Sequence, residues 1–417
     1  MTPVPLRRNR DFLLLQSGQL LSDAGTQSTS IAYPLLVLAV TGSAAKAGVV
    51  AFARTLPLAL FALPAGLLAD RWNRRRLMIT ADGVRVVAIG SLAATILAQR
   101  VAYWVIPLVA FVEGSGATLF AAAHPGALRA VVPARQLPAA MGAQTGRQAA
   151  VGLVGPTAGG ALFELARALP FLVDTVSYAC STVSLLAMRT PFQQQREPDR
   201  SPLRSRLAEG FRFLWGHPFL RTCALLFGLA NFLGPGLLLA IVVLGRRQEL
   251  TGGQVGVLVA AFGACLLLGS LLSPLLRRLL PVRAVLLLEL WTWPGCALFL
   301  VWPNVYVLTA SILPTALAIP STDSVVHGYR IAMTPDRLLG RAESVRSTIS
   351  LVIAPLGPLV AGALLGATSA RVTIALFAAS ALALAIWGTV SPSIRSAPRL
   401  DQLDDLSGGG SQVALGP

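Results

Sequence analysis

The sequence is poor in charged residues, which make up 12% of its 417 positions. A soluble globular chain carries about 25%. Hydrophobic residues account for 54%, and the mean hydropathy is +0.68. So little charge argues against a water-soluble enzyme, and so much apolar surface argues against a disordered chain. The composition therefore predicts a protein of the lipid bilayer.

Residues that support metal, redox or phosphate chemistry are scarce. The four cysteines lie in apolar runs without a C-x-x-C pair, and the three histidines are far apart, so neither a disulfide framework nor a metal site is predicted. The single lysine, Lys46, follows Ala45, so the sequence has no P-loop. Ser43 and Lys46 fit the S-x-x-K spacing of some hydrolases, but the partner motifs are missing. We expect no enzyme activity, no metal and no cofactor, and an ion gradient as the energy source.

Long apolar runs are abundant. About 20 apolar residues in a helix cross the hydrocarbon layer of a bilayer. Twelve such spans are predicted, at residues 12–40, 46–69, 77–98, 102–124, 137–164, 169–189, 219–245, 253–276, 283–301, 303–327, 342–367 and 371–390. The sequence thus predicts an all-α membrane protein with an N-terminal six-helix bundle (1–189), a polar linker (190–217), a C-terminal six-helix bundle (218–391) and a disordered tail (392–417).

The distribution of basic residues predicts the orientation. Lysine and arginine number 34 against 18 acidic residues. If the N-terminus is cytoplasmic, 23 of the basic residues fall in cytoplasmic segments and 6 in outer loops. This bias fits the positive-inside rule, with both termini and the linker in the cytoplasm. It explains the excess charge without a nucleic-acid partner. The preponderance of arginine favours a bacterial source, so we expect a monomeric protein of the bacterial inner membrane.

The two halves of the chain share an internal repeat. Residues 129–162 align with residues 331–364 without a gap, at a constant offset of 202. Pro133 falls on Pro335, and the pair Gly155-Pro156 falls on Gly357-Pro358. Two six-helix halves related in this way are typical of a transporter built by duplication, so the bundles are predicted to be pseudo-symmetric.

A cluster of small and charged residues joins the second and third spans. Asp70 lies at a helix end among arginines, where it can form charge-assisted hydrogen bonds that hold helix bundles together on one side of the membrane. The alternative is a tight loop whose arginines only fix topology. The segment Gly66-Leu-Leu-Ala-Asp-Arg-Trp-Asn-Arg-Arg-Arg76 resembles the signature of the major facilitator superfamily. The resemblance implies a cytoplasmic gate that involves Gly66, Asp70, Arg71, Arg74 and Arg75, with Glu343 and Arg346 as partners from the second half.

The fifth span carries a glycine-rich motif around Pro156. Its small residues allow close helix contact, and the proline bends the helix. The segment Gly152-Leu-Val-Gly-Pro-Thr-Ala-Gly-Gly160 resembles the G-P motif of proton-coupled antiporters in the same superfamily. The resemblance implies a hinge formed by Gly152, Gly155, Pro156, Gly159 and Gly160. Ordinary packing of membrane helices is the alternative.

A broader resemblance covers nearly the whole chain. Segments such as Phe171-Leu-Val-Asp174 and Glu209-Gly-Phe-Arg-Phe-Leu214 are similar to the branch of the superfamily that holds macrolide-efflux pumps and the enterobactin exporter. This branch implies proton-driven export by alternating access, with spans one, four, seven and ten around a central cavity. The contacts predicted in span seven are Phe227, Asn231 and Phe232.

Charged residues inside the membrane are costly and mark functional sites. Asp23, Arg54 and Glu113 all fall near the middle of predicted spans, and we expect an Asp23–Arg54 pair. A carboxyl group in an apolar helix can bind and release a proton near neutrality. Glu113 is therefore the first candidate for proton coupling, followed by Asp23 and Glu289. The alternative for Glu113 is a structural hydrogen bond.

Other polar residues in the spans receive separate predictions. Asp82 and Arg85 are three residues apart and are expected to form a local structural pair. Arg147 precedes the glycine-rich motif and is expected, like Arg54, to face the cavity. Asp174 matches the family pattern, but its position near the outer end of span six is also compatible with a solvated side chain.

Together these features predict proton-coupled efflux of small amphipathic molecules: a drug, an antibiotic, or a secondary metabolite such as a siderophore. The expected partners are this substrate, protons and the bilayer. A lysophospholipid transporter of the same fold and a non-transporting membrane scaffold or sensor remain as alternatives. An uptake symporter and a membrane hydrolase are disfavoured by the glycine-proline motif and by the absence of a nucleophile motif.

Overall fold

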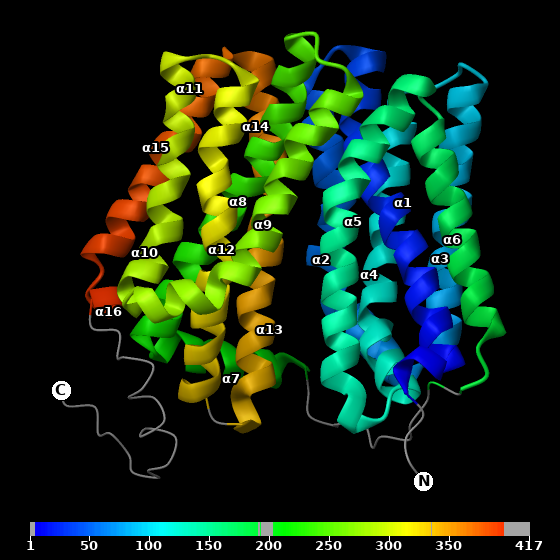
Figure 1. Cartoon of the computed structure of the whole chain (residues 1–417), viewed down its shortest axis with the longest axis horizontal. Helices are drawn as coiled ribbons and strands as arrows, with labels where there is room; N and C mark the ends of the chain where they lie inside the picture. Colours follow the sequence, from blue (N-terminus) through cyan, green and yellow to red (C-terminus); the bar gives the residue numbers. More distant parts are fainter. Residues whose placement is uncertain (1–4, 191, 193–202, 335, 396–417) are drawn as a thin grey trace. The chain divides into compact units, whose positions relative to one another are not determined.

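The computed structural model describes residues 5–190, 192, 203–334 and 336–395, and every regular element in this part of the chain is helical (Figure 1). The α-helices of the first half are α1 (Arg10–Thr41), α2 (Ala44–Arg71), α3 (Arg74–Leu97), α4 (Val105–Val131), α5 (Leu137–Leu165) and α6 (Leu169–Ala187). Those of the second half are α7 (Leu203–Gly216), α8 (Pro218–Arg247), α9 (Gly252–Leu279), α10 (Val282–Thr292), α11 (Leu298–Val301), α12 (Val305–Met333), α13 (Asp336–Ile353), α14 (Leu356–Ala367), α15 (Ala370–Val390) and α16 (Pro392–Arg395).

Twelve of these segments cross the membrane, as predicted. Within the described residues, ten are long and apolar enough by length and composition alone. Two of the ten are composite: α10 continues into α11, and the end of α13 continues into α14. The remaining two are α1 and α5, which have 32 and 29 residues but carry polar side chains along their length. At 1.5 Å per residue both exceed the roughly 30 Å of the hydrocarbon layer.

The helices differ from the predicted spans at proline residues and in the linker. Residues 293–297 around Pro294 form a 3-10 turn between α10 and α11, and Pro355 separates α13 from α14. A proline removes a backbone donor, so an interruption at these positions is expected. The predicted polar linker contains α7, and the predicted tail begins with α16; residues 396–417 lie outside the described part.

Local capping explains where the first helices begin and end. Asn9 caps α1 by accepting a hydrogen bond from the Phe12 amide, and Gly42 ends α1 with a φ of 64°, a left-handed conformation that favours glycine. Ser43 then caps α2 by accepting from the Lys46 amide. The S-x-x-K spacing at Ser43 is thus a helix cap.

The contacts divide the chain into two compact units. One comprises α1–α6 together with Pro235–Ala264 and Pro355–Thr373, which include parts of α8 and α9 and all of α14. The other holds Arg200–Gly234, Cys265–Ala354 and the chain from Ile374 onward. This division reflects which residues contact one another in the structure. The predicted division into two six-helix bundles, with its boundary in 190–217, is based on the sequence repeat and stays a prediction.

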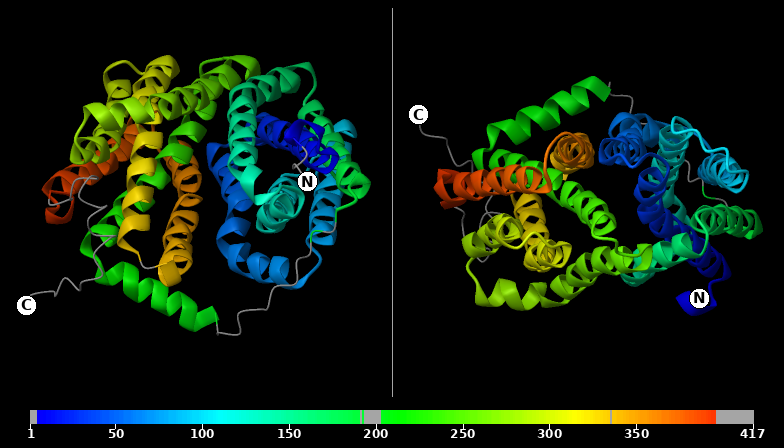
Figure 2. Two further views of the ribbon diagram at one scale, coloured as in Figure 1. Left: turned by 60° about the horizontal axis from the view of Figure 1, so that its bottom comes forward. Right: turned by 90° about the horizontal axis from the view of Figure 1, so that it is seen from above.

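In the first unit, α1 lies against α5 and α6, while α4 lies against α2 and α3 (Figure 2). Near the predicted cytoplasmic ends of these helices, buried side chains that include Phe12, Met78, Phe120 and Leu185 form an apolar core. This core leaves the polar residues of α1–α4 and α6 to meet farther along the helices, where they form the site described below.

The sequence repeat is also a repeat of contacts within this unit. A side chain on Gly160 of α5 would collide with the backbone of Gly252 on α9. Its counterpart at the offset of 202, Gly362 of α14, would place a Cβ 2.8 Å from the Cα of Gly48 on α2. The carbonyls of Pro156 and Pro358 approach α9 and α2 in the same manner. Equivalent residues of the two copies therefore serve equivalent close helix contacts.

Candidate functional site

Arg54 of α2 and Glu113 of α4 form a buried ion pair. Two guanidinium nitrogens, Nε and Nη2, donate to the two carboxylate oxygens, each at 3.0 Å. The Glu113 side chain is 1% exposed and that of Arg54 is 17% exposed. Gly114 brings the helices together, because a Cβ at this position would collide with the carbonyl of Arg54. A bidentate pair of this kind is charge-assisted and directional.

Asp23 does not pair with Arg54, so the expected Asp23–Arg54 pair is wrong. Asp23 instead lies 3.1 Å from Nη2 of Arg147 on α5, and Nη1 of Arg147 donates to the Gln16 side chain at 2.9 Å. Arg147 is buried, whereas 32% of the Asp23 side chain is exposed. The two predicted residues Asp23 and Arg147 therefore form one neutral pair between α1 and α5.

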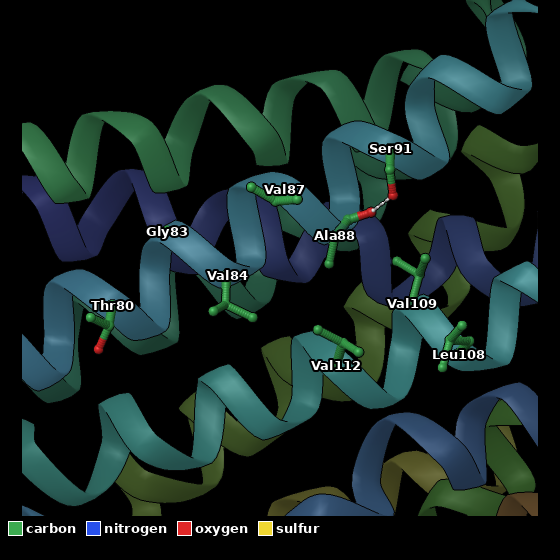
Figure 3. Close-up of a pocket in the computed structure, with 9 residues that line it drawn as sticks. All are labelled: Thr80, Gly83, Val84, Val87, Ala88, Ser91, Leu108, Val109 and Val112. Atoms are coloured by element: carbon green, nitrogen blue, oxygen red, sulfur yellow. Dashed lines mark hydrogen bonds between the residues drawn. The ribbon is translucent and has the colours of Figure 1, made fainter.

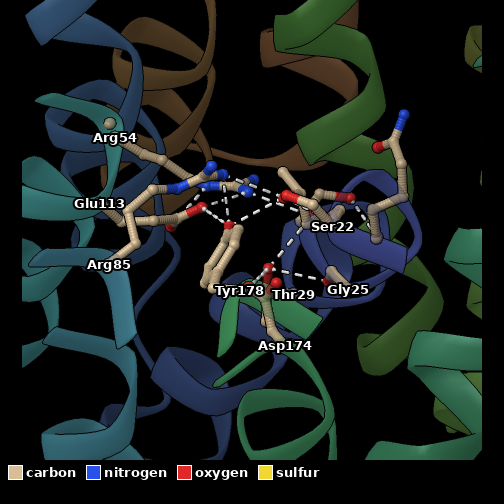
Figure 4. A network of polar contacts seen from close by, with 12 residues as sticks. Ser22, Gly25, Thr29, Arg54, Arg85, Glu113, Asp174 and Tyr178 are labelled. Carbon is tan, nitrogen blue, oxygen red and sulfur yellow. Dashed lines mark hydrogen bonds and ion pairs between the residues drawn. The ribbon is translucent and has the colours of Figure 1, made fainter. Parts of the chain in front are cut away.

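Arg85 of α3 joins the buried residues of four helices (Figure 4). Nη1 lies 3.3 Å from Asp82, which confirms the predicted local pair. Nη2 donates to the hydroxyls of Tyr178 on α6 and Thr26 on α1. The Tyr178 hydroxyl in turn lies 3.3 Å from Glu113. Arg85 is thus more than a local partner of Asp82, because it connects α1 and α6 with the Arg54–Glu113 pair.

Asp174 of α6 is fully buried, so the alternative of a solvated side chain is wrong. Its Oδ2 accepts from the Thr29 hydroxyl at 2.9 Å, and its Oδ1 lies 3.3 Å from the Ser177 hydroxyl. Thr29 also lies 3.0 Å from the carbonyl oxygen of Thr26, which accepts from Arg54. Asp174 is therefore connected to the other charges through the hydroxyl-rich face of α1 (Figure 4).

We call Arg54, Asp82, Arg85, Glu113 and Asp174 the buried charge cluster. It depends on the close approach of α1 and α6, since a Cβ on Gly25 would collide with the side chains of Asp174 and Ser177. The spacing of Asp174, Ser177 and Tyr178 places all three on one face of α6. This spacing in the sequence could have indicated that Asp174 shares a polar face with Ser177 and Tyr178 and is not solvated.

The glycine-rich motif of α5 lies between α1 and α9. On one face, a Cβ at Gly155 would be 2.5 Å from the Cβ of Gln27, and one at Gly159 would collide with the backbone of Ser28. On the other face, Pro156 and Gly160 approach α9 as described above, and the carbonyl oxygen of Gly152 lies 3.0 Å from a Cβ built on Gly263. The motif thus brings α1 and α9 close to the same helix, and its role as a hinge stays a prediction.

The loop between α2 and α3 is tied to its own bundle by arginines. Arg75 donates to the carbonyls of Leu185 and Leu186 near the end of α6, and Arg74 donates to the carbonyl of Ala69. Asp70 is 76% exposed and lies 3.8 Å from Arg74.

The other predicted gate residues add little to these ties. Arg71 is exposed, and no described atom lies within 4 Å of a Cβ built on Gly66. The side chains of Glu343 and Arg346 on α13 lie outside the described part, so the predicted gate is untested.

The predicted residues of the second half lie in the second compact unit. Glu289 of α10 is buried beside Thr322 and Trp293. Asn231 of α8 is exposed and donates to Ser350 of α13 at 3.3 Å, and to the carbonyl of Phe227. Phe232 stacks on Phe377 of α15 with ring centroids 5.2 Å apart. Phe232 therefore has an aromatic partner, whereas Asn231 keeps an exposed amide.

An apolar groove of about 580 Å³ runs between α3 and α4 (Figure 3). Val84, Val87, Leu108 and Val112 are among its lining residues. None of the residues predicted to bind substrate or protons lines this groove. Its apolar lining is what a surface in contact with acyl chains requires.

Comparisons with known proteins agree on the class of protein. The family described as "Transmembrane secretion effector" matches residues 2–407. The multidrug efflux pump Tap of Mycolicibacterium fortuitum is 28% identical, over 94% of this chain and 97% of that protein. Macrolide efflux protein A of Streptococcus pyogenes is 25% identical over 43% of this chain and 45% of its own length.

Solved transporter structures share the fold. A bacterial homologue of the iron transporter ferroportin in its inward-facing state has a TM-score of 0.74 at 18% identity, over 93% of this chain and 99% of its own. A mutant of the nucleoside transporter NupG also has a TM-score of 0.74, at 13% identity, over 92% of this chain and 100% of its own.

The Arg54–Glu113 pair generates a test of stability. Arg54→Met leaves the Glu113 carboxylate buried without its cation, which costs about 3–5 kcal/mol. Adding Glu113→Gln removes the uncompensated charge, so the double variant is expected to unfold at a higher temperature than Arg54→Met alone. Thermal unfolding of the purified protein in detergent measures both. Arg100→Met, at an exposed turn, is the matched control and is expected to unfold like the wild type. Purely additive losses from the two substitutions would refute the pairing.

Proposed function

This chain belongs to the transmembrane secretion effector family of the major facilitator superfamily, and from that membership we propose that it exports small amphipathic molecules in exchange for protons. The proposed site of action is the bacterial inner membrane, with both termini in the cytoplasm. The observation that carries the proposal is the similarity to a multidrug efflux pump along 94% of the chain. The proposed substrates are drugs, antibiotics or secondary metabolites such as siderophores.

The buried charge cluster supports proton coupling. Ionised side chains inside a membrane are costly and are retained where a transport pathway or a proton relay needs them. The cluster places Glu113, the first candidate of the sequence, in contact with residues of α2 and α6. Glu289 supplies a second buried carboxyl group in the other compact unit.

Alternating access requires contacts that open on one side of the membrane while others close. At the predicted outer side, α5 contacts α9 and α14 contacts α2 through glycines. There Glu164 of α5 lies 2.8 Å from Arg246 of α8. At the predicted inner side, Asp70 is 76% exposed, and its gate contacts with the second half stay a prediction. We propose that these two sets of contacts form and separate in turn.

Substrate recognition is proposed at the exposed polar groups of the cavity helices. Asp23 is the partly exposed member of its pair with Arg147, and Asn231 presents an exposed amide from α8. Polar groups presented from otherwise apolar helices suit molecules that combine an apolar body with one or two polar groups.

Two alternatives lead to different outcomes in the same assay. A lysophospholipid transporter of this fold would move lipid and would leave drugs unmoved. A non-transporting scaffold or sensor would move neither and would tolerate Glu113→Gln and Asp70→Asn without a phenotype.

Efflux from loaded cells or uptake into everted vesicles tests the proposal with erythromycin, a catecholate siderophore, ethidium and a fluorescent lysophospholipid. We expect movement of at least one of the first three that stops when an uncoupler collapses the proton gradient. Vesicles without the protein are the control. Movement that persists without a gradient, or movement of none of the first three compounds, would contradict proton-coupled export.

A cross-link tests the proposed separation of the outer contacts. In a variant with Cys180, Cys223, Cys265 and Cys296 replaced by alanine, Glu164→Cys and Arg246→Cys place two thiols where the ion pair stood. Oxidation is expected to abolish transport, because the outer side cannot open, and a reductant is expected to restore it. Glu164→Cys alone is the control and should transport after oxidation. Full transport by the oxidised double variant, with the disulfide verified, would show that these contacts do not separate.

A further inference from the structure

The buried charge cluster contains an uneven number of charges. It has two guanidinium groups, Arg54 and Arg85, and three carboxyl groups, Asp82, Glu113 and Asp174. Ion pairing assigns one carboxylate to each cation: Glu113 to Arg54 at 3.0 Å, and Asp82 to Arg85 at 3.3 Å. Among the described residues no ion pair involves Asp174, whose side chain has a relative exposure of 0%.

Hydroxyl groups are the partners of Asp174. Thr29 lies 2.9 Å from Oδ2, and Ser177 lies 3.3 Å from Oδ1. A hydroxyl can donate to a carboxylate or accept from a carboxylic acid. The Thr29 hydroxyl has both options, because it can turn its hydrogen to the carbonyl oxygen of Thr26 at 3.0 Å and then accept from Asp174. The surroundings of Asp174 therefore satisfy its ionised and its protonated form.

The energetics favour a proton on Asp174 in the observed arrangement. With all five groups ionised, the cluster carries one uncompensated negative charge, and an unpaired buried charge costs several kcal/mol. Glu113 repels a carboxylate at Asp174, whereas Arg85 and Arg54 attract it from α3 and α2 while already bound to their own partners. Tyr33 of α1 and Tyr178 of α6 are further titratable groups that interact with Asp174. One proton makes the cluster neutral.

We propose that Asp174 is the residue that binds and releases the transported proton, while Glu113 stays ionised in its pair with Arg54. This inference rests on the proposed proton-coupled export and names the proton site within it. The bond that changes is the O–H bond of the Asp174 carboxyl group, and the proton passes to water when the site opens. The role differs from that of Glu113, whose charge is held by Arg54.

Helix α1 connects this proton site to the glycine-rich motif. Asp174 contacts Gly25 and Thr29 of α1. Ser28, which directly precedes Thr29, contacts Gly159 of α5. Loss of the proton leaves a net charge that favours an arrangement with water or a free cation beside Asp174. A shift of α1 that admits water also changes its contact with α5, which in turn contacts α9 at the predicted outer side.

Transport of ethidium tests the assignment with three variants. Asp174→Asn keeps the size of the side chain and removes the titratable proton. We expect its uncoupler-sensitive efflux to fall to the level of wild type treated with uncoupler, while ethidium exchange across vesicles without a gradient continues. Glu113→Gln leaves two carboxylates beside two guanidinium groups, so Asp174 needs no proton for neutrality and the efflux of this variant is expected to shift to a lower pH. Thr29→Val keeps the Asp174 carboxyl group but removes one partner, so its efflux should show a shifted pH profile.

Acid–base titration of the purified protein gives a readout that does not depend on a substrate. Wild type is expected to bind one proton more than Asp174→Asn between the basic and acidic limits of the neutral range. The double variant Arg54→Met/Glu113→Gln, which keeps one excess carboxyl group, is expected to titrate like wild type there. Identical titration of wild type and Asp174→Asn, or uncoupler-sensitive efflux at the wild-type rate in Asp174→Asn, would overturn the assignment. If Asp174→Asn does not fold, an unshifted pH profile of Thr29→Val overturns it. Wild-type efflux that is unaffected by the uncoupler would instead refute proton-coupled export. The titration would then still show whether Asp174 binds a proton in the neutral range.

Discussion

The cost of a charge inside the membrane is the constraint on which this structure depends. Five charged residues of α2, α3, α4 and α6 lie in one buried cluster, where water cannot solvate them individually. Each must find a partner on another helix, or in the case of Asp82 on its own. Helices α1–α4 and α6 are therefore held in one arrangement by polar contacts as well as by apolar packing. Within the described residues, the side-chain partners of Asp174 are the hydroxyl groups of Thr29 and Ser177. Binding or loss of a proton at Asp174 therefore changes the charge balance of the cluster.

Helix α1 gives the cluster its connection to the rest of the first unit. Its small and hydroxyl-bearing residues allow close contact on two faces: Gly25 and Thr29 toward α6, and Ser28 toward the α5 motif. The same polar composition explains why α1 and α5 fall outside the set of helices that are apolar enough to be recognised as spans by composition. Close contacts and weak hydrophobicity coincide in these two helices, because both carry small or polar residues where neighbouring helices approach.

The sequence predicted what depends on periodicity and proximity along the chain. Twelve crossings, the repeat at an offset of 202 and the Asp82–Arg85 pair all follow from apolar runs or from neighbours on one helix. Pairing between helices did not follow. Arg54 pairs with Glu113, 59 positions away, and not with Asp23, because the rotation of each helix about its axis decides which side chains meet. Position along a span likewise could not reveal that Asp174 faces α1 and not the solvent.

The central claim is that a carboxylic acid, and not a carboxylate, occupies the cluster at Asp174. Infrared difference spectroscopy of the purified protein during titration reports the carbonyl stretch of protonated carboxyl groups and its shift in D2O. The account predicts a band that appears on acidification through the neutral range, is present in the double variant Arg54→Met/Glu113→Gln and is absent from Asp174→Asn. A band that survives in Asp174→Asn and disappears in the double variant would contradict it.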